Sequence, residues 1–365
     1  MTTTIGTDSF SIPQQMRAAQ IVEYNQPYTL SIVAVPQIGE DDLLVKVYAA
    51  GFCHSDFQVL QGQFPAPLPM IPSHEPVGIV VQVGSKATKR FKPGDRVGVL
   101  NFKHACGKCV GCTSTLRTSG RTDPRFCEQR EAAGFRHDGA FAEYMVADSQ
   151  TSVALPSSIS FEQGAPLMCA GATVWGALCK ALPALHAGDT VGIVGIGGLG
   201  HLGVQFAKAL GYRTIALDNR AAGRQLAAEI SEDLRPDLTV DSSAEDAGAS
   251  VLRFTNGVGL GAVVVCTDSV PATSWSLGLL RTGGVLVPLG LPAEKWQFDS
   301  ALMVFRELVI KGAYVASRDQ VEEMLKVVSQ HDIKSHVTSV SLDDVPDIVR
   351  RYQQSDFKGR LVVKI

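Results

Sequence analysis

Hydrophobic runs of two kinds divide the chain into a β-rich first part and a later part in which helices and strands alternate. From residue 17 to about residue 99, short apolar runs such as 43–47 and 78–83 are separated by proline and glycine. Runs bounded in this way are typical of strands joined by turns. The first part therefore predicts a partly open, β-barrel-like domain.

The pattern changes at Phe161. Segments rich in alanine and leucine, which predict helices, then alternate with short runs of valine and isoleucine at residues 189–194, 213–218, 237–240, 261–266 and 284–289. This alternation predicts a parallel, doubly wound sheet. After Lys311 the pattern is mixed, and we expect a helix over 321–330 and a final strand over 359–363 that returns to the first domain.

The composition is that of a globular α/β protein with two domains. The 365 residues are 45% hydrophobic and 19% charged, which supports sizeable cores. We expect residues 1–160 and 311–365 to form the β-rich domain and residues 161–310 to form a Rossmann domain. The net charge of −3 gives no support for binding to nucleic acid or to anionic membranes, and no apolar run is long enough to span a membrane. Residues 1–20 do not read as a signal or transit peptide, so we expect a cytoplasmic protein.

Four of the 8 cysteines predict a structural zinc site. Cys106, Cys109 and Cys112 follow one another at two-residue gaps, and Cys127 comes later. Four thiolates close a tetrahedral shell, which predicts a structural zinc ion in a lobe formed by residues 104–128. The alternatives are a redox cluster and a zinc finger that reads nucleic acid. The nearby basic residues are dispersed in an expected loop without a helix or aromatic platform, which favours a solvated face.

A second set of residues suggests a zinc site with an open position. Cys53 stands in a turn after an apolar run, His74 lies in a proline-rich segment, and Cys169 is far downstream. Two thiolates and one imidazole suit zinc, and three protein ligands leave the fourth position to a reactant. The alternative is that these are ordinary buried cysteines and a core histidine.

A glycine-rich loop predicts a dinucleotide site. Residues 195–200 read Gly-Ile-Gly-Gly-Leu-Gly between a predicted strand and a predicted helix. Gly195 permits a tight turn, Gly197 lets the backbone approach a pyrophosphate, and Gly200 allows close packing of helix on strand. Gly198 and Leu199 complete the loop, whose N–H groups face the phosphates at the helix N-terminus. Asp218, at the end of the next strand, would bind the ribose hydroxyls, which favours NAD over NADP. The alternative involves Arg220, two residues further on, which could stack on adenine or receive a phosphate.

In this order the motifs resemble those of the zinc-dependent medium-chain alcohol dehydrogenases, most closely the yeast-type and cinnamyl-alcohol-type branches. The resemblance covers about residues 17–365 and is carried by residues 51–56, 73–78, 106–127, 137–144, 169–173 and 195–200. It implies a GroES-like catalytic domain, a Rossmann domain, two zinc ions per chain and a nicotinamide cofactor. It also implies a small alcohol or aldehyde substrate and a homo-oligomer, either a dimer or a tetramer.

The resemblance also assigns roles to single residues. By the family pattern Cys53, His74 and Cys169 hold the catalytic zinc, Glu75 stands near it, and Asp56 orients the His74 imidazole. Ser55 would hydrogen-bond the substrate oxygen, whereas His54, Thr173 and Arg360 match positions that contact the cofactor.

Three departures from the family pattern alter the expectation. Gln58 stands where the yeast-type pattern has a histidine, so the last step of proton export differs. The gap between the third and fourth lobe cysteines is longer than usual, which a zinc site tolerates because loop-closure entropy grows slowly with length. Leu60, Phe64 and Asn101 stand near the pocket positions and imply substrates bulkier than ethanol. The alternatives are a polyol or secondary-alcohol dehydrogenase of the same superfamily and a catalytically silent protein that binds NAD and zinc.

Overall fold

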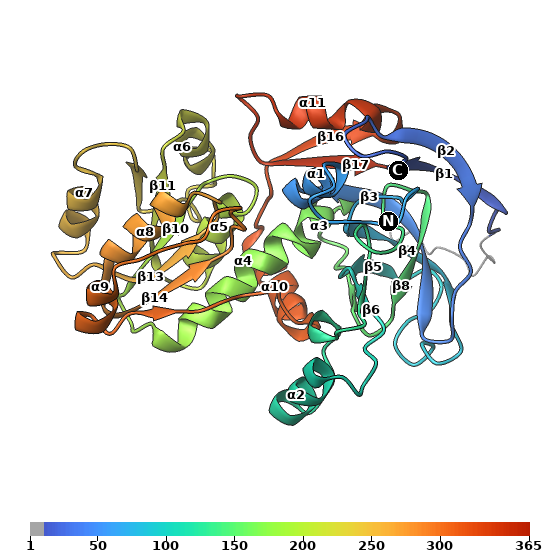
Figure 1. The fold of residues 1–365 in the computed structure, drawn as a ribbon, viewed down its shortest axis with the longest axis horizontal. Helices are drawn as coiled ribbons and strands as arrows, with labels where there is room; N and C mark the ends of the chain where they lie inside the picture. The colour runs from blue at the N-terminus through green and yellow to red at the C-terminus, as the bar shows by residue number, and fades with distance from the viewer. Residues whose placement is uncertain (1–10) are drawn as a thin grey trace. The chain divides into compact units, whose positions relative to one another are not determined.

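The structure is a computed structural model that describes residues 11–365, and the chain divides into two compact units. The first unit contains the chain up to Cys169, together with Val337–Gln354 and Arg360–Ile365. The second unit contains Ala170–His336 and Ser355–Gly359. Figure 1 labels the helices and strands of the two units.

The first unit is built on a sheet with the strand order β16-β17-β3-β4-β5-β9, and β8 pairs with the N-terminal half of β3, whereas β17 pairs with its C-terminal end. All of its pairs are antiparallel except β16 with β17. Two small sheets, β1-β2 and β6-β7, complete the unit. Its elements are β1 (Gln15–Gln20), β2 (Thr29–Ala34), β3 (Asp42–Phe52), α1 (His54–Leu60), β4 (Glu75–Val83), β5 (Arg96–Val99), β6 (Phe102–Lys103), α2 (Val110–Ser119), η1 (Pro124–Phe126), β7 (Glu131–Ala132), β8 (Tyr144–Asp148), β9 (Ser152–Ala154), α3 (Phe161–Gly164), η2 (Ala165–Met168), β16 (Val337–Ser341), η4 (Leu342–Asp347), α11 (Ile348–Tyr352) and β17 (Arg360–Lys364).

The second unit is a six-stranded parallel sheet with the order β12-β11-β10-β13-β14-β15, the doubly wound order that the alternating pattern predicts. Its elements are α4 (Ala170–Ala181), η3 (Leu182–Ala184), β10 (Thr190–Val194), α5 (Gly200–Ala209), β11 (Arg213–Asp218), α6 (Ala221–Ala228), β12 (Leu238–Asp241), α7 (Ala247–Phe254), β13 (Leu260–Val265), α8 (Val270–Gly278), β14 (Leu280–Pro288), α9 (Ser300–Phe305), β15 (Val309–Ile310) and α10 (Arg318–His331).

Successive side chains of the central strand β10 point to opposite faces of this sheet. Val194 belongs to a core cluster that contains side chains of α7, α8 and α9. Ile193, one position earlier, faces α5, where a Cβ on Gly203 would lie 3.5 Å from its side chain. Because successive strand residues point to opposite faces, helices cover the sheet on both sides.

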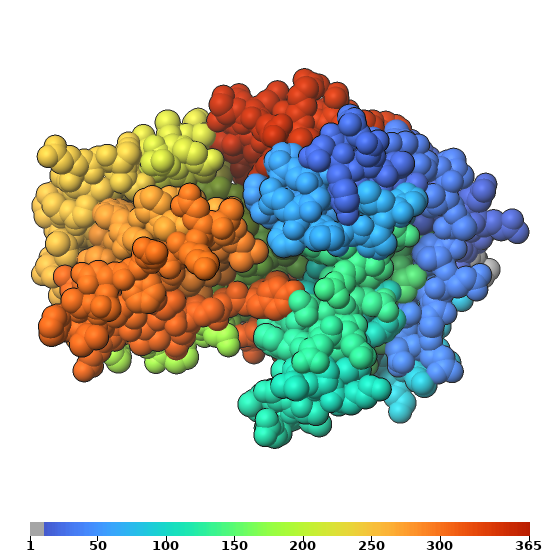
Figure 2. Space-filling view, in the orientation of Figure 1, coloured from blue at the N-terminus to red at the C-terminus, as the bar shows by residue number. Residues whose placement is uncertain are grey.

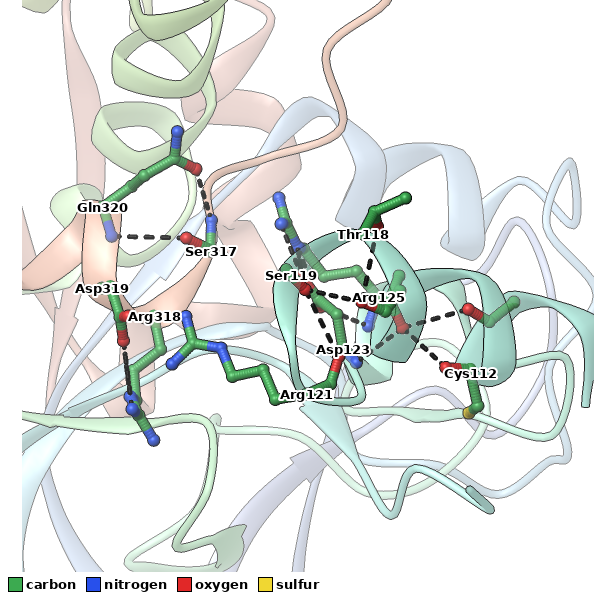
Figure 3. Close-up of polar contacts among 12 residues, drawn as sticks. Cys112, Thr118, Ser119, Arg121, Asp123, Arg125, Ser317, Arg318, Asp319 and Gln320 are labelled. Atoms are coloured by element: carbon green, nitrogen blue, oxygen red, sulfur yellow. Dashed lines mark hydrogen bonds and ion pairs between the residues drawn. The ribbon is translucent and has the colours of Figure 1, made fainter. Parts of the chain in front are cut away.

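The observed units differ from the expected domain limits in two segments. Residues 161–169 lie with the first unit, because α3 and η2 pack against β3, β4 and β17. Residues 311–336 lie with the second unit, because α10 packs against α4 and α5. Helix α10 begins with a capping box in which Ser317 and Gln320 bond each other's backbone (Figure 3). The final strand β17 pairs with β3, as expected.

Within residues 11–365, no single helix is long and apolar enough to cross a membrane. Phe161–Met168 and Ala170–Ala184 satisfy the length and composition criteria only when they are taken together across a bend.

Candidate active site

Cys53, His74, Glu75 and Cys169 converge in the first unit, where one ligand atom from each lies within 4.8 Å of the others. The pairing of β3 with β4 places the end of one strand beside the start of the other, with Gly51 opposite Glu75. Cys53 follows β3 as the N-cap of α1, and His74 directly precedes β4. The His74 Nε2 atom is 3.3 Å from the Cys169 Sγ atom. The structure therefore brings together the three residues that the sequence suggested as ligands.

Asp56 connects two of these residues. Its Oδ1 atom is 3.0 Å from His74 Nδ1, and its Oδ2 atom accepts a hydrogen bond of 2.8 Å from the Cys53 N–H. The carboxylate is fully buried at 0% exposure. A histidine that donates Nδ1–H to a carboxylate presents its Nε2 lone pair to a metal. Asp56 therefore lies where the predicted orienting role requires.

A buried ion pair lies beside the converging residues. Arg360 of β17 pairs with Glu75 Oε1, and both side chains are buried. The other carboxylate oxygen, Oε2, is buried and has no hydrogen-bond partner. Burial raises the pKa of Glu75 to about 7, although the Arg360 cation opposes this. A Cβ on Gly51 would lie 1.9 Å from Oε2, so glycine is the residue that leaves room for the carboxylate.

The charges of the site favour a thiolate at Cys53. A hydrogen bond from the Cys169 thiol lowers the pKa of Cys53 well below its usual value, with help from His74 and Arg360 and against burial. The same hydrogen bond and burial raise the pKa of Cys169. Burial disfavours the His74 imidazolium, but the Asp56 carboxylate raises the pKa of His74 well above its usual value. Two sulfur atoms, one ring nitrogen and an unpartnered carboxylate oxygen are a donor set that fits zinc.

The other predicted residues of α1 lie next to this donor set. Ser55 is half-buried, and its Oγ atom is 3.5 Å from His74 Nε2. Gln58 is one helical turn further along α1 and is also half-buried. His54 is exposed, and its Nδ1 atom is 3.0 Å from the hydroxyl of Tyr352. Arg360, assigned to the cofactor by the resemblance, is engaged by Glu75 in the structure.

Cys106, Cys109, Cys112 and Cys127 form the second cluster, again with ligand atoms within 4.8 Å of one another. Backbone N–H groups point at the sulfur atoms, such as the N–H of Cys112 at 3.4 Å from the Sγ atom of Cys109. Hydrogen bonds from the N–H groups of Glu128 and Cys112 lower the pKa of Cys109 to about 6. The four sulfur atoms fit a closed zinc site.

The lobe around this cluster is more ordered than the sequence suggested. The expected loop contains helix α2, so the expectation of no helix among the basic residues was wrong. The hydroxyl of Thr115 bonds back to the Gly111 carbonyl and accepts the Asp123 N–H. Asp123 in turn holds Arg125 through a 2.6 Å ion pair (Figure 3). The lobe is drawn in teal in Figure 2.

The glycine-rich loop of the second unit follows β10 as predicted. Gly195 has a φ of 87°, a conformation that glycine adopts without strain. A Cβ on Gly200 would lie 2.0 Å from the Gly195 carbonyl oxygen, which explains the close packing of α5 on this turn. A Cβ on Gly197 would meet only the end of the Arg220 side chain, at 3.6 Å, so this backbone is open to a ligand.

The remaining cofactor candidates also belong to the second unit. Asp218 ends β11, is buried, and accepts a 2.6 Å hydrogen bond from the Ile196 N–H. Arg220 forms an ion pair with the same carboxylate at 3.2 Å. Gly198 and Leu199 lie between β10 and α5, and Leu199 is the N-cap of that helix. Thr173 lies in the first turn of α4 and is half-buried.

Sequence reasoning missed four features of the site. Phe135 packs its ring 5.0 Å from the His74 ring and 6.0 Å from Phe64. The hydroxyl of Tyr352 reaches His54, although 298 residues separate the two. The Glu75–Arg360 ion pair and the backbone of Ser73 are the other two. No sequence pattern indicates the two long-range pairs, whereas Ser73 directly precedes His74, and this position marks it as a candidate.

Comparisons with known proteins identify relatives along most of the chain. Residues 39–157 match the family described as "Alcohol dehydrogenase GroES-like domain", and residues 198–330 match the family described as "Zinc-binding dehydrogenase". An alcohol dehydrogenase of Geobacillus stearothermophilus is 34% identical over 352 residues, which cover 96% of this chain and 100% of the relative. The solved alcohol dehydrogenase of Aeropyrum pernix superposes with a TM-score of 0.83 at 29% identity and covers 96% of this chain and 100% of its own.

Acetophenone reductase from Geotrichum candidum, solved in complex with NAD, has a TM-score of 0.80 at 26% identity and covers 98% of this chain and 99% of its own. The matches extend over both units. The chain therefore belongs to the zinc-dependent medium-chain alcohol dehydrogenase family, whose members are oxidoreductases that act on alcohols.

Proposed function

We propose that this protein is a zinc-dependent alcohol dehydrogenase that interconverts a primary or secondary alcohol and its aldehyde or ketone with NAD(H). The convergence of two thiols and His74 Nε2 beside a buried, half-partnered Glu75 is the observation that carries this proposal. Cys53, His74 and Cys169 would hold the catalytic zinc, and the four lobe cysteines a structural one. A zinc ion at the first site supplies Lewis acidity toward the substrate oxygen, and the nicotinamide supplies hydride transfer.

The chain's own residues perform the positioning and the proton handling. Asp56 keeps the proton of His74 on Nδ1, so that Nε2 stays available as a ligand atom. Ser55, within 3.5 Å of that Nε2, is placed to take a hydrogen bond from a substrate hydroxyl bound at the same point. Ser55 would pass the substrate proton on. Because the Gln58 side chain does not titrate, it cannot act as the next proton acceptor, and the proton must leave by another route. Glu75 pairs with Arg360 through Oε1 and keeps Oε2 without a partner, so this carboxylate could enter the ligand set during exchange.

The substrate we propose is apolar and larger than ethanol. The rings of Phe64 and Phe135 form an edge-to-face pair, and Phe135 packs against His74. A wall of this kind favours an apolar or aromatic alcohol over a polyol, whose hydroxyl groups would lose water without finding partners. Leu60, which the resemblance placed near the pocket, is buried at 5% exposure.

NAD rather than NADP is the proposed cofactor. The Asp218 carboxylate ends β11 beside the glycine-rich loop, where it would accept hydrogen bonds from ribose hydroxyls and repel a 2′-phosphate. Arg220 already pairs with this carboxylate. A 2′-phosphate would therefore have to compete with Asp218 for that cation.

We further propose that the protein is a homo-oligomer. Six large apolar side chains of the second unit are exposed between residues 291 and 314, namely Leu291, Phe298, Val304, Phe305, Val309 and Tyr314. Phe305 is 84% exposed, and the segment follows the edge of the sheet at β15. Figure 2 shows this orange segment on the surface of the second unit. Light scattering should give a multiple of 38.9 kDa, and Phe305→Glu should lower that mass.

Metal analysis and a cofactor titration test the proposed activity together. We expect about two zinc ions per chain, tight binding of NADH followed by fluorescence, and oxidation of apolar alcohols in a screen with NAD and NADP. A single zinc ion, or two with no turnover of any aliphatic, aromatic or cyclic alcohol, would contradict the proposal. The second result would favour a silent NAD- and zinc-binding protein on this fold.

A further inference from the structure

Ser73, the residue before His74, has a backbone conformation that serine rarely adopts. Its φ is 77°, in the left-handed region that residues other than glycine avoid. The residue is fully buried, with 0% exposure. A non-glycine residue keeps such a conformation only where its surroundings hold it there.

Three hydrogen bonds hold Ser73 in place. Its hydroxyl donates to the Gly51 carbonyl at 2.8 Å, and its N–H donates to Asp56 Oδ1 at 3.2 Å. Its own carbonyl accepts from the Ala140 N–H at 3.0 Å. The residue is thereby joined to the end of β3, to the carboxylate that orients His74, and to the loop before β8.

Two glycines close around the same backbone. A Cβ on Gly139 would lie 2.0 Å from the Ser73 carbonyl oxygen, and one on Gly134 would lie 2.7 Å from it. The loop that contains them therefore packs directly against the Ser73 carbonyl. Two contacts therefore stabilise the strained φ of Ser73: the packing of this loop against its carbonyl, and the hydrogen bond from its hydroxyl to the Gly51 carbonyl.

We propose that Ser73 is a positioning residue of the catalytic metal site. Glycine would meet the demand for a positive φ at no steric penalty, but it could not donate a hydrogen bond to Gly51. Serine adds an anchor to a residue that lies two positions before Cys53. Cys53, which follows β3, and His74, which precedes β4, are thus held in a fixed position relative to each other. This inference rests on the proposed zinc site at Cys53, His74 and Cys169.

The test measures metal retention at each cluster without using enzyme activity. The zinc-loaded full-length protein is treated with EDTA and an alkylating reagent, and peptide mass spectrometry follows the modification of each cysteine with time. Cys53 and Cys169 report on the catalytic site. The four lobe cysteines report on the structural site in the same sample and serve as an internal reference.

Ser73→Gly removes the hydroxyl and relieves the backbone. We expect its unfolding temperature to stay within about 3 °C of that of the parent protein. We expect alkylation of Cys53 and Cys169 to become roughly 10- to 100-fold faster, the usual range for loss of a residue that supports a metal ligand. The lobe cysteines should react at the parent rate.

Two further variants separate the hydroxyl from the backbone. Ser73→Ala keeps the strained φ and loses the anchor, so it should unfold at a lower temperature than Ser73→Gly and release metal at least as fast. Ser152→Ala is the matched control. Ser152 is also fully buried, lies in the same unit, and donates a 2.8 Å hydrogen bond to the Asp148 carbonyl. Its loss should leave Cys53 and Cys169 protected.

The outcomes distinguish the two proposals. Parent-like protection of Cys53 and Cys169 in both Ser73 variants would overturn the role given to Ser73 and leave the zinc site intact. Equal loss of protection in Ser152→Ala would also overturn it, because any buried hydroxyl would then act in the same way. If the zinc-loaded parent protein itself shows no protection of Cys53 and Cys169, the proposed zinc site fails, and this inference fails with it.

Discussion

Replacing Asp56 by asparagine tests the centre of the proposed metal site. The carboxylate accepts from the N–H groups of Cys53 at 2.8 Å and Ser73 at 3.2 Å, and lies 3.0 Å from His74 Nδ1. An asparagine can keep its oxygen toward Ser73 and His74, where both bonds meet Oδ1. Its NH₂ group then faces the N–H of Cys53, so that one buried donor meets another.

The magnitude follows from these three bonds. Loss of the charged bond to Cys53 costs about 1.5–3 kcal/mol, and weakening of the two others from charged to neutral costs roughly 1 kcal/mol each. The expected loss is therefore roughly 3–5 kcal/mol, a large fraction of the roughly 5–15 kcal/mol that stabilises a typical domain. Zinc affinity at the site should fall by about 10- to 100-fold because His74 loses its fixed orientation.

Urea unfolding and zinc content after dialysis measure the two effects. Asp95→Asn is the matched control, because Asp95 lies in the same unit and accepts one backbone N–H, from Lys92, in an exposed turn. That substitution should cost less than about 1 kcal/mol. Asp56 does not have the proposed role if Asp56→Asn shifts the urea midpoint no further than Asp95→Asn and retains both zinc ions.

Four further predictions concern other residues. Cys169→Ala should abolish turnover in a folded protein that still binds NADH, and activity equal to the parent would remove Cys169 from the ligand set. Gln58→His should change the pH profile of alcohol oxidation; an unaltered profile would place Gln58 off the proton path. Asp218→Ser should raise the kcat/KM ratio of NADP to NAD by about tenfold, roughly 1.4 kcal/mol, and an unchanged ratio would argue against a role in cofactor choice. A hydrogen bond from Arg281 lowers the pKa of Asp189. The stabilisation by this pair is present above the unfolded pKa of about 3.9 and is lost as pH falls through the lower folded value. Asp189→Asn should therefore lower the unfolding temperature by about 3 °C at pH 7, and an equal difference persisting at pH 2 would contradict the assignment.

The parts of the site that depend on local spacing could be predicted from the sequence. The Cys106–Cys112 run places its thiols in successive turns, and the backbone N–H groups of the run bond those same sulfur atoms. The glycine loop likewise needs only a strand, a positive φ at Gly195 and a helix start at Gly200. In both cases these particular contacts are made by residues less than ten positions apart, so the sequence pattern specifies them.

Contacts between distant segments could not be predicted in the same way. Arg360 and Glu75 are 285 residues apart, and only the register of β17 and β4 on either side of β3 brings them together. The resemblance assigned Arg360 to the cofactor. Nothing in the sequence indicated that the buried carboxylate of Glu75 would pair with it. Ser73 could not be predicted for another reason. A serine does not indicate a left-handed backbone conformation, whereas a glycine often does.

Helix α2 was missed because its sequence favours other structures. The segment Val110–Ser119 is rich in threonine, serine and glycine, which are poor helix formers. In the structure the hydroxyls of Thr115 and Thr118 bond carbonyls four residues back, and Cys109 accepts the Cys112 N–H as an N-cap. The N-cap bond at Cys109 and the clustering of Cys109 and Cys112 with the other two cysteines outweigh intrinsic propensity.

The place of β17 in the first sheet has a consequence for synthesis on the ribosome. This strand pairs with the C-terminal half of β3, yet about 300 residues of chain are made between the two. At roughly 5–20 residues per second, nascent β3 waits about 15–60 seconds for its neighbour. Throughout that interval its open edge can pair with another chain. The C-terminal half of β3 therefore stays exposed to pairing with other chains until almost the whole protein has been synthesised.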